Sequence, residues 1–221
     1  MIVAHSRMPL RDFMKLNHLD DLDDHQAATL MRIIHVLVLH HDGQKRQSGE
    51  DYDEHLMATY LVIKELGFPF YIQAAALLHD SIEDCVLIDY NFLQANFKPP
   101  EIADLVRGIT KYNPKTYFDQ MRRDITILGH WEILPLKGSD RLHNLATVNG
   151  FTDIDRRVRF CEETLGPLCG LYHDCRSYVP TEYSAAVDEL YNSVMVLAKS
   201  RRDENLAAKK LTMADLMSAS P

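Results

Sequence analysis

The chain has 221 residues, of which 46% are hydrophobic and 25% are charged. That length is enough for one domain with its own core, and the balance is that of an ordinary globular protein rather than of a disordered or fibrous chain. A formal net charge of −8 disfavours non-specific binding to nucleic acid or to an anionic membrane, so we expect no stable nucleic-acid complex and no membrane partner.

Neither end of the sequence nor its cysteines point to export. The first residues, 1–7, lack the apolar core of a signal peptide, and the longest apolar run, residues 33–39, is too short to span a bilayer. The four cysteines form no C-x-x-C pair, which is typical of reduced, packed thiols. We therefore predict a cytoplasmic protein.

Apolar residues recur at helical spacing along most of the chain. Residues 1–25 form a mixed N-terminal segment that becomes acidic, and residues 26–41 read as a buried helix followed by a polar loop, residues 42–50. The remaining helices are expected at residues 53–66, 71–80, 90–96, 99–108, 117–128, 131–148, 155–175 and 180–200. Residues 201–221 read as a frayed helix or tail. Because no segment alternates with a period of two, the predicted fold class is all-α.

The stretch from Ala74 to Asp84 gathers ionisable side chains at the end of an apolar helix. If the helix continued without a break, His79, Asp80, Glu83 and Asp84 would lie on one arc of about 140°. Burying one imidazole and three carboxylates together is costly unless something offsets the charge. A divalent cation is the natural partner for such a group.

Two more segments could complete a metal site. They are His55, early in the second predicted helix, and Asp140, within the run Lys137 to Asn144. Two imidazoles and two carboxylates suit Mn²⁺, Fe²⁺ or Zn²⁺ better than an ion that prefers thiolates. Each of these histidines alone is more often a surface or core residue, so the argument depends on their occurring together.

The pattern H…HD…ED…D resembles the HD-domain metal phosphohydrolases. Within them the chain is similar to the hydrolase domain of the RelA/SpoT homologues, which degrades the alarmone (p)ppGpp. The similarity runs from about residue 34 to residue 148. It is carried by the segments 41–50 (with Gln-x-Arg-x-Ser-Gly), 75–84, 108–111 and 137–144 (with Asp-Arg-Leu-His-Asn), together with His55.

This resemblance implies an HD-type helical bundle over residues 26–200 and an assignment for each site residue. A metal, usually Mn²⁺ although another divalent transition metal also fits, would be bound by His55, His79, Asp80 and Asp140. Glu83 and Asp84 would orient and deprotonate the attacking water. Substrate contacts would come from Arg46 and Ser48 at the guanine base and from Asn144 and Thr147 near the ribose and phosphates. Apart from the resemblance, Lys111, Lys115, Arg122 and Arg123 form a candidate basic rim for the 5′-phosphates, although solvated helix charges are the better interpretation for at least two of them.

The implied reaction is hydrolysis of the 3′-pyrophosphate of (p)ppGpp to GDP or GTP plus pyrophosphate, by a stand-alone small alarmone hydrolase without a synthetase domain. The sequence departs from the family at Leu56, where proline is usual, at Ala146, where arginine is usual, and in the loop 112–116. These departures leave the substrate open. One alternative is the 2′-phosphate of NADPH. Another is a pyrophosphorylated tRNA, with the protein as antitoxin to a toxic synthetase. A third is a catalytically silent nucleotide-binding regulator.

Overall fold

The computed structural model describes residues 22–41 and 43–218. Most of the expected N-terminal segment and the last three residues lie outside the described residues. Within the described part every regular element is a helix, apart from an isolated bridge between Lys45 and Asp51, so the predicted all-α class is confirmed. The helices are α2 (Asp24–His41), α3 (Tyr52–Glu65), α4 (Phe70–Leu78), α5 (Ser81–Asp84), α6 (Tyr90–Asn96), α7 (Glu101–Ile109), α8 (Tyr117–Leu128), α9 (Ile133–Thr147), α10 (Ile154–Glu163), α11 (Cys169–Cys175) and α12 (Thr181–Ser218), with short turns η1 (Val148–Gly150), η2 (Thr164–Leu168) and η3 (Arg176–Tyr178).

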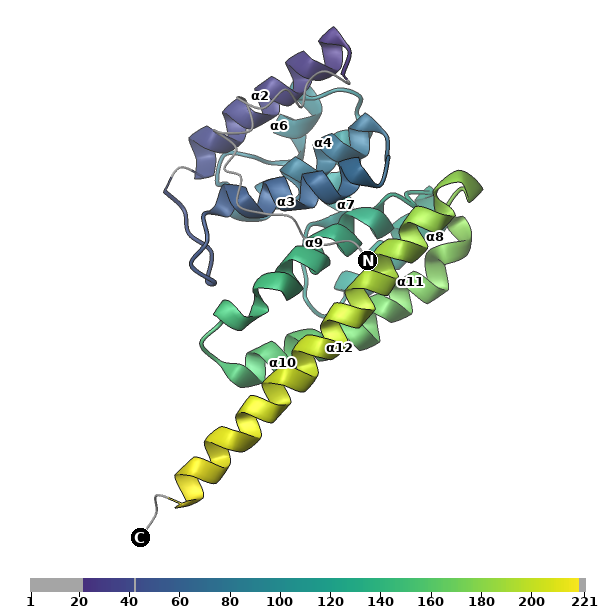
Figure 1. Cartoon of the computed structure of the whole chain (residues 1–221). Coiled ribbons are helices and arrows are strands. Elements are labelled where there is room, and N and C mark those ends of the chain that lie inside the picture. The colour runs from purple at the N-terminus through teal and green to yellow at the C-terminus, as the bar shows by residue number, and fades with distance from the viewer. Residues whose placement is uncertain (1–21, 42, 219–221) are drawn as a thin grey trace.

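Helix α4 lies in the interior and ends directly before His79 and Asp80. Ile72 and residues 74–78 are fully buried, so the helix is apolar on nearly every side, as a buried helix must be. It packs against α2, α3, α7 and α9, and its three consecutive alanines allow these neighbours to approach closely (Figure 1). The residues that follow Leu78 are therefore delivered into the middle of the bundle.

Helix α12 forms the opposite side of the molecule, against α9 and α10 (Figure 1). A Cβ on Gly138 of α9 would lie 2.9 Å from Leu190 Cδ2, which shows how closely these two helices pack. The segment expected as a frayed helix or tail continues α12 to Ser218. It is tied down there, because Asn205 donates to Asn149 and Lys209 pairs with Asp155.

Two predicted helices are interrupted. The segment 155–175 is split by the π-helical turn η2, where Pro167 lacks the N–H that an α-helical ladder needs. The helix expected over 71–80 ends at Leu78, whose carbonyl accepts a hydrogen bond from Ser81 Oγ (2.6 Å), and α5 begins anew at Ser81. The single arc expected from an unbroken helix therefore does not apply to the motif.

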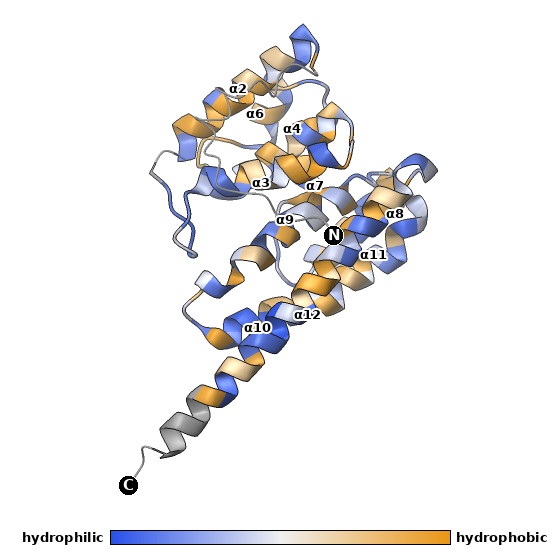
Figure 2. Ribbon diagram, viewed as in Figure 1, coloured by the Kyte–Doolittle hydropathy of each residue, from blue (hydrophilic) through white to orange (hydrophobic). Residues whose placement is uncertain are grey.

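Hydropathy follows this packing (Figure 2): α10 is the most hydrophilic region near the site, whereas α4 is apolar. In the part of the chain that the structure describes, none of the helices has the length and apolarity needed to cross a bilayer. The four cysteines are free and buried, as predicted for reduced, packed thiols.

Candidate metal centre

Three helices bring two imidazoles and two carboxylates to one point. His55 projects from α3, His79 and Asp80 follow α4, and Asp140 projects from α9. The ligand atoms of His55, His79 and Asp80 lie within 4.8 Å of one another, and the two imidazole Nε2 atoms are 3.0 Å apart. Asp140 Oδ1 lies 3.4 Å from His55 Nε2 and 3.7 Å from His79 Nε2.

These separations are those of atoms around a shared cation. Nitrogen and oxygen ligands lie about 2.0–2.2 Å from such an ion, which places neighbouring ligand atoms about 3.0–3.6 Å apart. Asp80 Oδ2 adds distances of 3.2 Å to His79 Nε2 and 3.5 Å to His55 Nε2. The group predicted from the sequence is thus brought together by the fold and could hold a divalent metal; its role as a ligand set stays a prediction.

The carboxylates and imidazoles strongly perturb one another. Burial alone would lower the pKa of His79, but the Asp80 charge and the hydrogen bonds to Asp140 and Asp80 outweigh it and raise the pKa to about 10. Burial raises the pKa of Asp80 and Asp140, yet His79 and Lys137 respectively reverse this and hold both pKa values well below the usual range. The two carboxylates are therefore ionised, which is the form that binds a cation.

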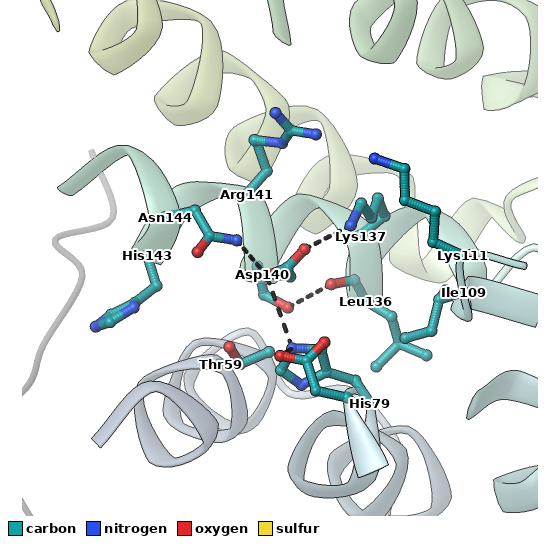
Figure 3. Close-up of polar contacts among 12 residues, drawn as sticks. Thr59, His79, Ile109, Lys111, Leu136, Lys137, Asp140, Arg141, His143 and Asn144 are labelled. Atoms are coloured by element: carbon teal, nitrogen blue, oxygen red, sulfur yellow. Dashed lines mark hydrogen bonds and ion pairs between the residues drawn. The ribbon is translucent and has the colours of Figure 1, made fainter. Parts of the chain in front are cut away.

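Other side chains hold the ligands in place (Figure 3). Asp140 is directed toward His79 and is flanked by Lys137, whose Nζ lies 2.6 Å from Asp140 Oδ2, and by Asn144, which donates to Asp140 Oδ1. His79 Nδ1 donates to the carbonyl of Ala76 at 2.8 Å, so its Nε2 is left to face the site. Such supporting hydrogen bonds fix the orientation of metal-binding imidazoles.

His55 is oriented by an imidazole instead of a carbonyl. Its Nδ1 lies 2.9 Å from Nδ1 of His143, which is buried in α9. Burial first, and then the neighbouring His55 and Arg46, lower the pKa of His143 to about 3, so His143 is neutral and its Nδ1 could accept a proton from His55 Nδ1. A metal held by His55 Nε2 would require this arrangement, with the ring proton on Nδ1.

We expect His143→Leu to raise the dissociation constant for Mn²⁺ by about 10- to 100-fold, since the orientation of His55 would be lost. Titration with Mn²⁺ followed by electron paramagnetic resonance measures this directly. His143→Gln, whose side-chain carbonyl can accept the same proton, should recover most of the affinity. If the Mn²⁺ dissociation constant of His143→Leu stays within twofold of the wild-type value, His143 does not orient His55.

The two acidic residues of α5 have different partners. Glu83 Oε1 accepts a hydrogen bond from the backbone N–H of Lys111 at 2.6 Å, and burial raises the pKa of Glu83. Asp84 accepts a hydrogen bond from the hydroxyl of Tyr52, which also lies 2.7 Å from Asp80 Oδ2. A carboxylate with a raised pKa near a metal is suited to accept a proton from water.

A cleft of about 500 Å³ opens over His79, Asp80 and Asp140. Five cations contribute to its lining, and they come from the α7–α8 loop, from α9 and from α10. The lining residues are His79, Asp80, Glu83, Ile109, Lys111, Tyr117, Lys137, Asp140, Arg141, Asn144, Arg156, Arg159, Phe160 and Glu163. Four carboxylates line the cleft as well, and Lys137 and Arg141 are paired with two of them, Asp140 and Glu163.

Only some of the residues predicted to contact the substrate line the cleft. Lys111 and Asn144 line the cleft, whereas Arg46, Ser48 and Thr147 are not among its lining residues. Arg46 reaches the site indirectly, by donating to Asn144 Oδ1. Thr147 Oγ1 donates to the carbonyl of His143 at 3.2 Å. The substrate roles of these residues stay predictions.

The expected basic rim is built differently. Arg122 pairs with Asp119 and Asp174, and neither Lys115 nor Arg123 lines the cleft. No role was predicted for Lys137, Arg141, Arg156 and Arg159, which do line it. Arg156, Arg159 and Phe160 share one face of a helix at spacings of three and four residues, but charges at such spacing are usually a solvated surface.

Comparisons with known proteins identify the family of the chain. The HD domain family model matches residues 34–166. The bifunctional (p)ppGpp synthase/hydrolase SpoT of Escherichia coli K12 is 27% identical over 176 residues, which are 73% of this chain and 25% of that protein. A probable GTP pyrophosphokinase of Mycobacterium leprae is 31% identical over 152 residues, 66% of this chain and 19% of that protein. The chain thus spans about a quarter or less of the length of these relatives.

A solved structure shares the fold. It is described as a metazoan ortholog of SpoT that hydrolyzes ppGpp, with a TM-score of 0.57 and 18% identity, over 75% of this chain and 94% of that one. The family model alone covers more than half of the 221 residues. The protein belongs to the HD-domain family.

Proposed function

We propose that the chain is a metal-dependent phosphohydrolase that removes the 3′-pyrophosphate of (p)ppGpp, with Mn²⁺ as its metal. The observation that carries the proposal is the group of His55, His79, Asp80 and Asp140 beneath a cleft with five cations. The relatives named above include a (p)ppGpp hydrolase, which supports this substrate class.

The donors of this group fit a divalent metal of the first transition row, because two imidazoles and two carboxylates form a mixed nitrogen and oxygen set. When bound, such a metal lowers the pKa of a water and stabilises charge that develops on phosphoryl oxygens. Asn144 and Lys137 hold Asp140 in place for it, as His143 and Ala76 hold the two imidazoles.

The chain's own side chains would perform the proton and charge chemistry. Glu83 or Asp84 would accept a proton from the attacking water, whose oxygen forms a bond to the 3′-phosphorus while the bond from that phosphorus to the ribose O3′ breaks. A proton then returns to O3′, and the products are GDP or GTP and pyrophosphate. Lys111, Lys137 and Arg141 would offset the charge of the phosphates, because they line the same cleft.

A substrate panel tests the proposal. The Mn²⁺-loaded protein would be incubated with ppGpp, pppGpp, NADPH and 3′-pyrophosphorylated tRNA, with products followed by ³¹P nuclear magnetic resonance. We expect pyrophosphate from the two guanosine nucleotides. Inorganic phosphate from NADPH alone would identify the alternative nucleotide, and no turnover of any substrate would favour the silent regulator. The toxic-synthetase and tRNA partners receive no support from the relatives named above.

The loop between α2 and α3, which carries Arg46 and Ser48, is the nucleotide loop that we propose binds the guanine base. A substitution at Gly150 tests this role. A Cβ there would lie 2.7 Å from both Cα and Cβ of Ser48, so Gly150→Ala must displace the loop that carries Arg46 and Ser48. If the loop binds the base, KM should rise about tenfold, since contacts to the bound nucleotide would be lost. Gly170→Ala is the matched control, since a Cβ at Gly170 meets nothing within 4 Å. An unchanged KM for Gly150→Ala would remove the loop from the binding site.

A further inference from the structure

Tyr52 lies between a predicted metal ligand and the acidic pair. It is the first residue of α3 and is only 7% exposed. Its hydroxyl lies 2.7 Å from Asp80 Oδ2 and makes a shorter contact with Asp84 Oδ2. The same Asp80 oxygen faces the imidazoles of His79 and His55, so one phenol oxygen connects Asp84 to the predicted metal group.

Asp80 and Asp84 compete for the single hydroxyl proton of Tyr52. A phenol has one O–H and can donate it to one acceptor at a time. Asp80 Oδ2 also lies 3.2 and 3.5 Å from the imidazole nitrogens of His79 and His55, so it has other partners. Asp84 is exposed on a helix of four residues, where packing does little to fix its side chain. The hydroxyl of Tyr52 therefore matters most for the position of Asp84.

The ring of Tyr52 packs where the predicted nucleotide loop meets α3. It stacks on His41 with a centroid distance of 4.5 Å and an interplanar angle of 1°, and the Arg46 guanidinium lies 5.6 Å from its centroid. Its backbone N–H donates to the carbonyl of Gln44 at 3.1 Å. His41 is itself held, because its Nδ1 donates to Gln44 Oε1 at 2.7 Å. The loop and the hydroxyl are thus joined by a ring with little freedom to move.

We propose that Tyr52 is a positioning residue: its hydroxyl holds the Asp84 carboxylate beside the metal ligands, and its ring links that placement to the loop that carries Arg46. The inference rests on the proposed function, because it assigns Asp84 a part in the hydrolysis. A purely structural phenol would stabilise the fold without affecting the rate at saturating metal and substrate.

Tyr52→Phe keeps the ring, the stack and the packing but removes the donor. At saturating Mn²⁺ we expect kcat for ppGpp hydrolysis to fall about 10- to 100-fold, since a hydrogen bond to a charged group is lost, while KM stays within about threefold. Tyr90→Phe is the matched control, because the Tyr90 hydroxyl also donates to a carboxylate, Asp104 at 2.8 Å, away from the cleft. A kcat within twofold of the wild type would overturn the proposal. So would a loss of rate seen only at limiting Mn²⁺ and absent at saturation, which would mean that Tyr52 acts only through the predicted metal ligand Asp80.

A second measurement needs no substrate. Crystal structures of the Mn²⁺-loaded wild type and Tyr52→Phe should show Asp80 unmoved and the Asp84 side chain turned away from the metal group in the variant. If Asp84 keeps its position without the hydroxyl, the proposal is wrong. A wild type that binds Mn²⁺ but leaves ppGpp intact would count against the proposed function alone, since the position of Asp84 would still be decided by this comparison.

Discussion

Asp80→Ala is expected to abolish hydrolysis, with a loss of at least about a thousandfold in kcat/KM, and to leave the fold intact. The carboxylate is one of four predicted ligand groups, and its Oδ2 lies 3.2 Å from His79 Nε2 and 3.5 Å from His55 Nε2. Its side chain is 24% exposed, so alanine leaves no sealed cavity. Steady-state pyrophosphate release measures the rate, and circular dichroism reports the fold.

The same variant should lose the stabilisation that the metal provides. For the wild type, Mn²⁺ at a hundred times its dissociation constant should add about 2.7 kcal/mol to the free energy of unfolding, which for a chain of this size raises Tm by about 5–10 °C. Asp104→Ala is a close control, because Asp104 also accepts from a tyrosine hydroxyl and is 25% exposed. Full hydrolysis by Asp80→Ala in saturating Mn²⁺ would show that the metal assignment is wrong.

The acidic pair of α5 should affect the rate without affecting metal binding. We expect Asp84→Asn and Glu83→Gln each to lower kcat by about 10²- to 10⁴-fold, because an amide cannot accept the proton of the attacking water. The Mn²⁺ dissociation constant of both variants should stay within about threefold of the wild type, since neither residue belongs to the ligand group. Single-turnover kinetics and an Mn²⁺ titration of each variant measure the two effects separately.

The two variants also separate the roles within the pair. Glu83 lines the cleft and is held by the backbone of Lys111, whereas Asp84 is held by Tyr52. If only one of the pair accepts the proton, its variant should show the larger loss and the other should retain measurable turnover. Equal and small losses, below about fivefold for both, would show that neither carboxylate acts as the base.

Helical periodicity predicted the fold well where one face of a helix meets the core. Leu30, Ile33, Ile34 and Leu37 mark α2 because their spacing matches the helical turn, and all four are buried. Breaks were harder to predict. The helix end at Leu78 depends on Ser81 bonding back to its carbonyl, and the π-helical turn depends on how Pro167 is accommodated by its neighbours. Neither contact leaves a periodic signal.

For the site, residue types in a recognisable order located the four predicted ligands, because their chemistry is visible in the sequence. Their supporting residues were harder to identify. Tyr52 lies one helical turn before His55, where an aromatic residue is usually core, and it is indeed buried. The motif Asp-Arg-Leu-His-Asn does not reveal that its histidine, His143 on α9, contacts His55 on α3. Only the tertiary packing of α3 on α9 brings these side chains together.

Diffraction from crystals soaked in Mn²⁺, recorded on both sides of the manganese absorption edge, tests the central claim most directly. We predict one anomalous peak with His55 Nε2, His79 Nε2 and carboxylate oxygens of Asp80 and Asp140 about 2.0–2.3 Å away. A protein that hydrolyses ppGpp with Mn²⁺ but shows no peak among these four side chains would contradict the account.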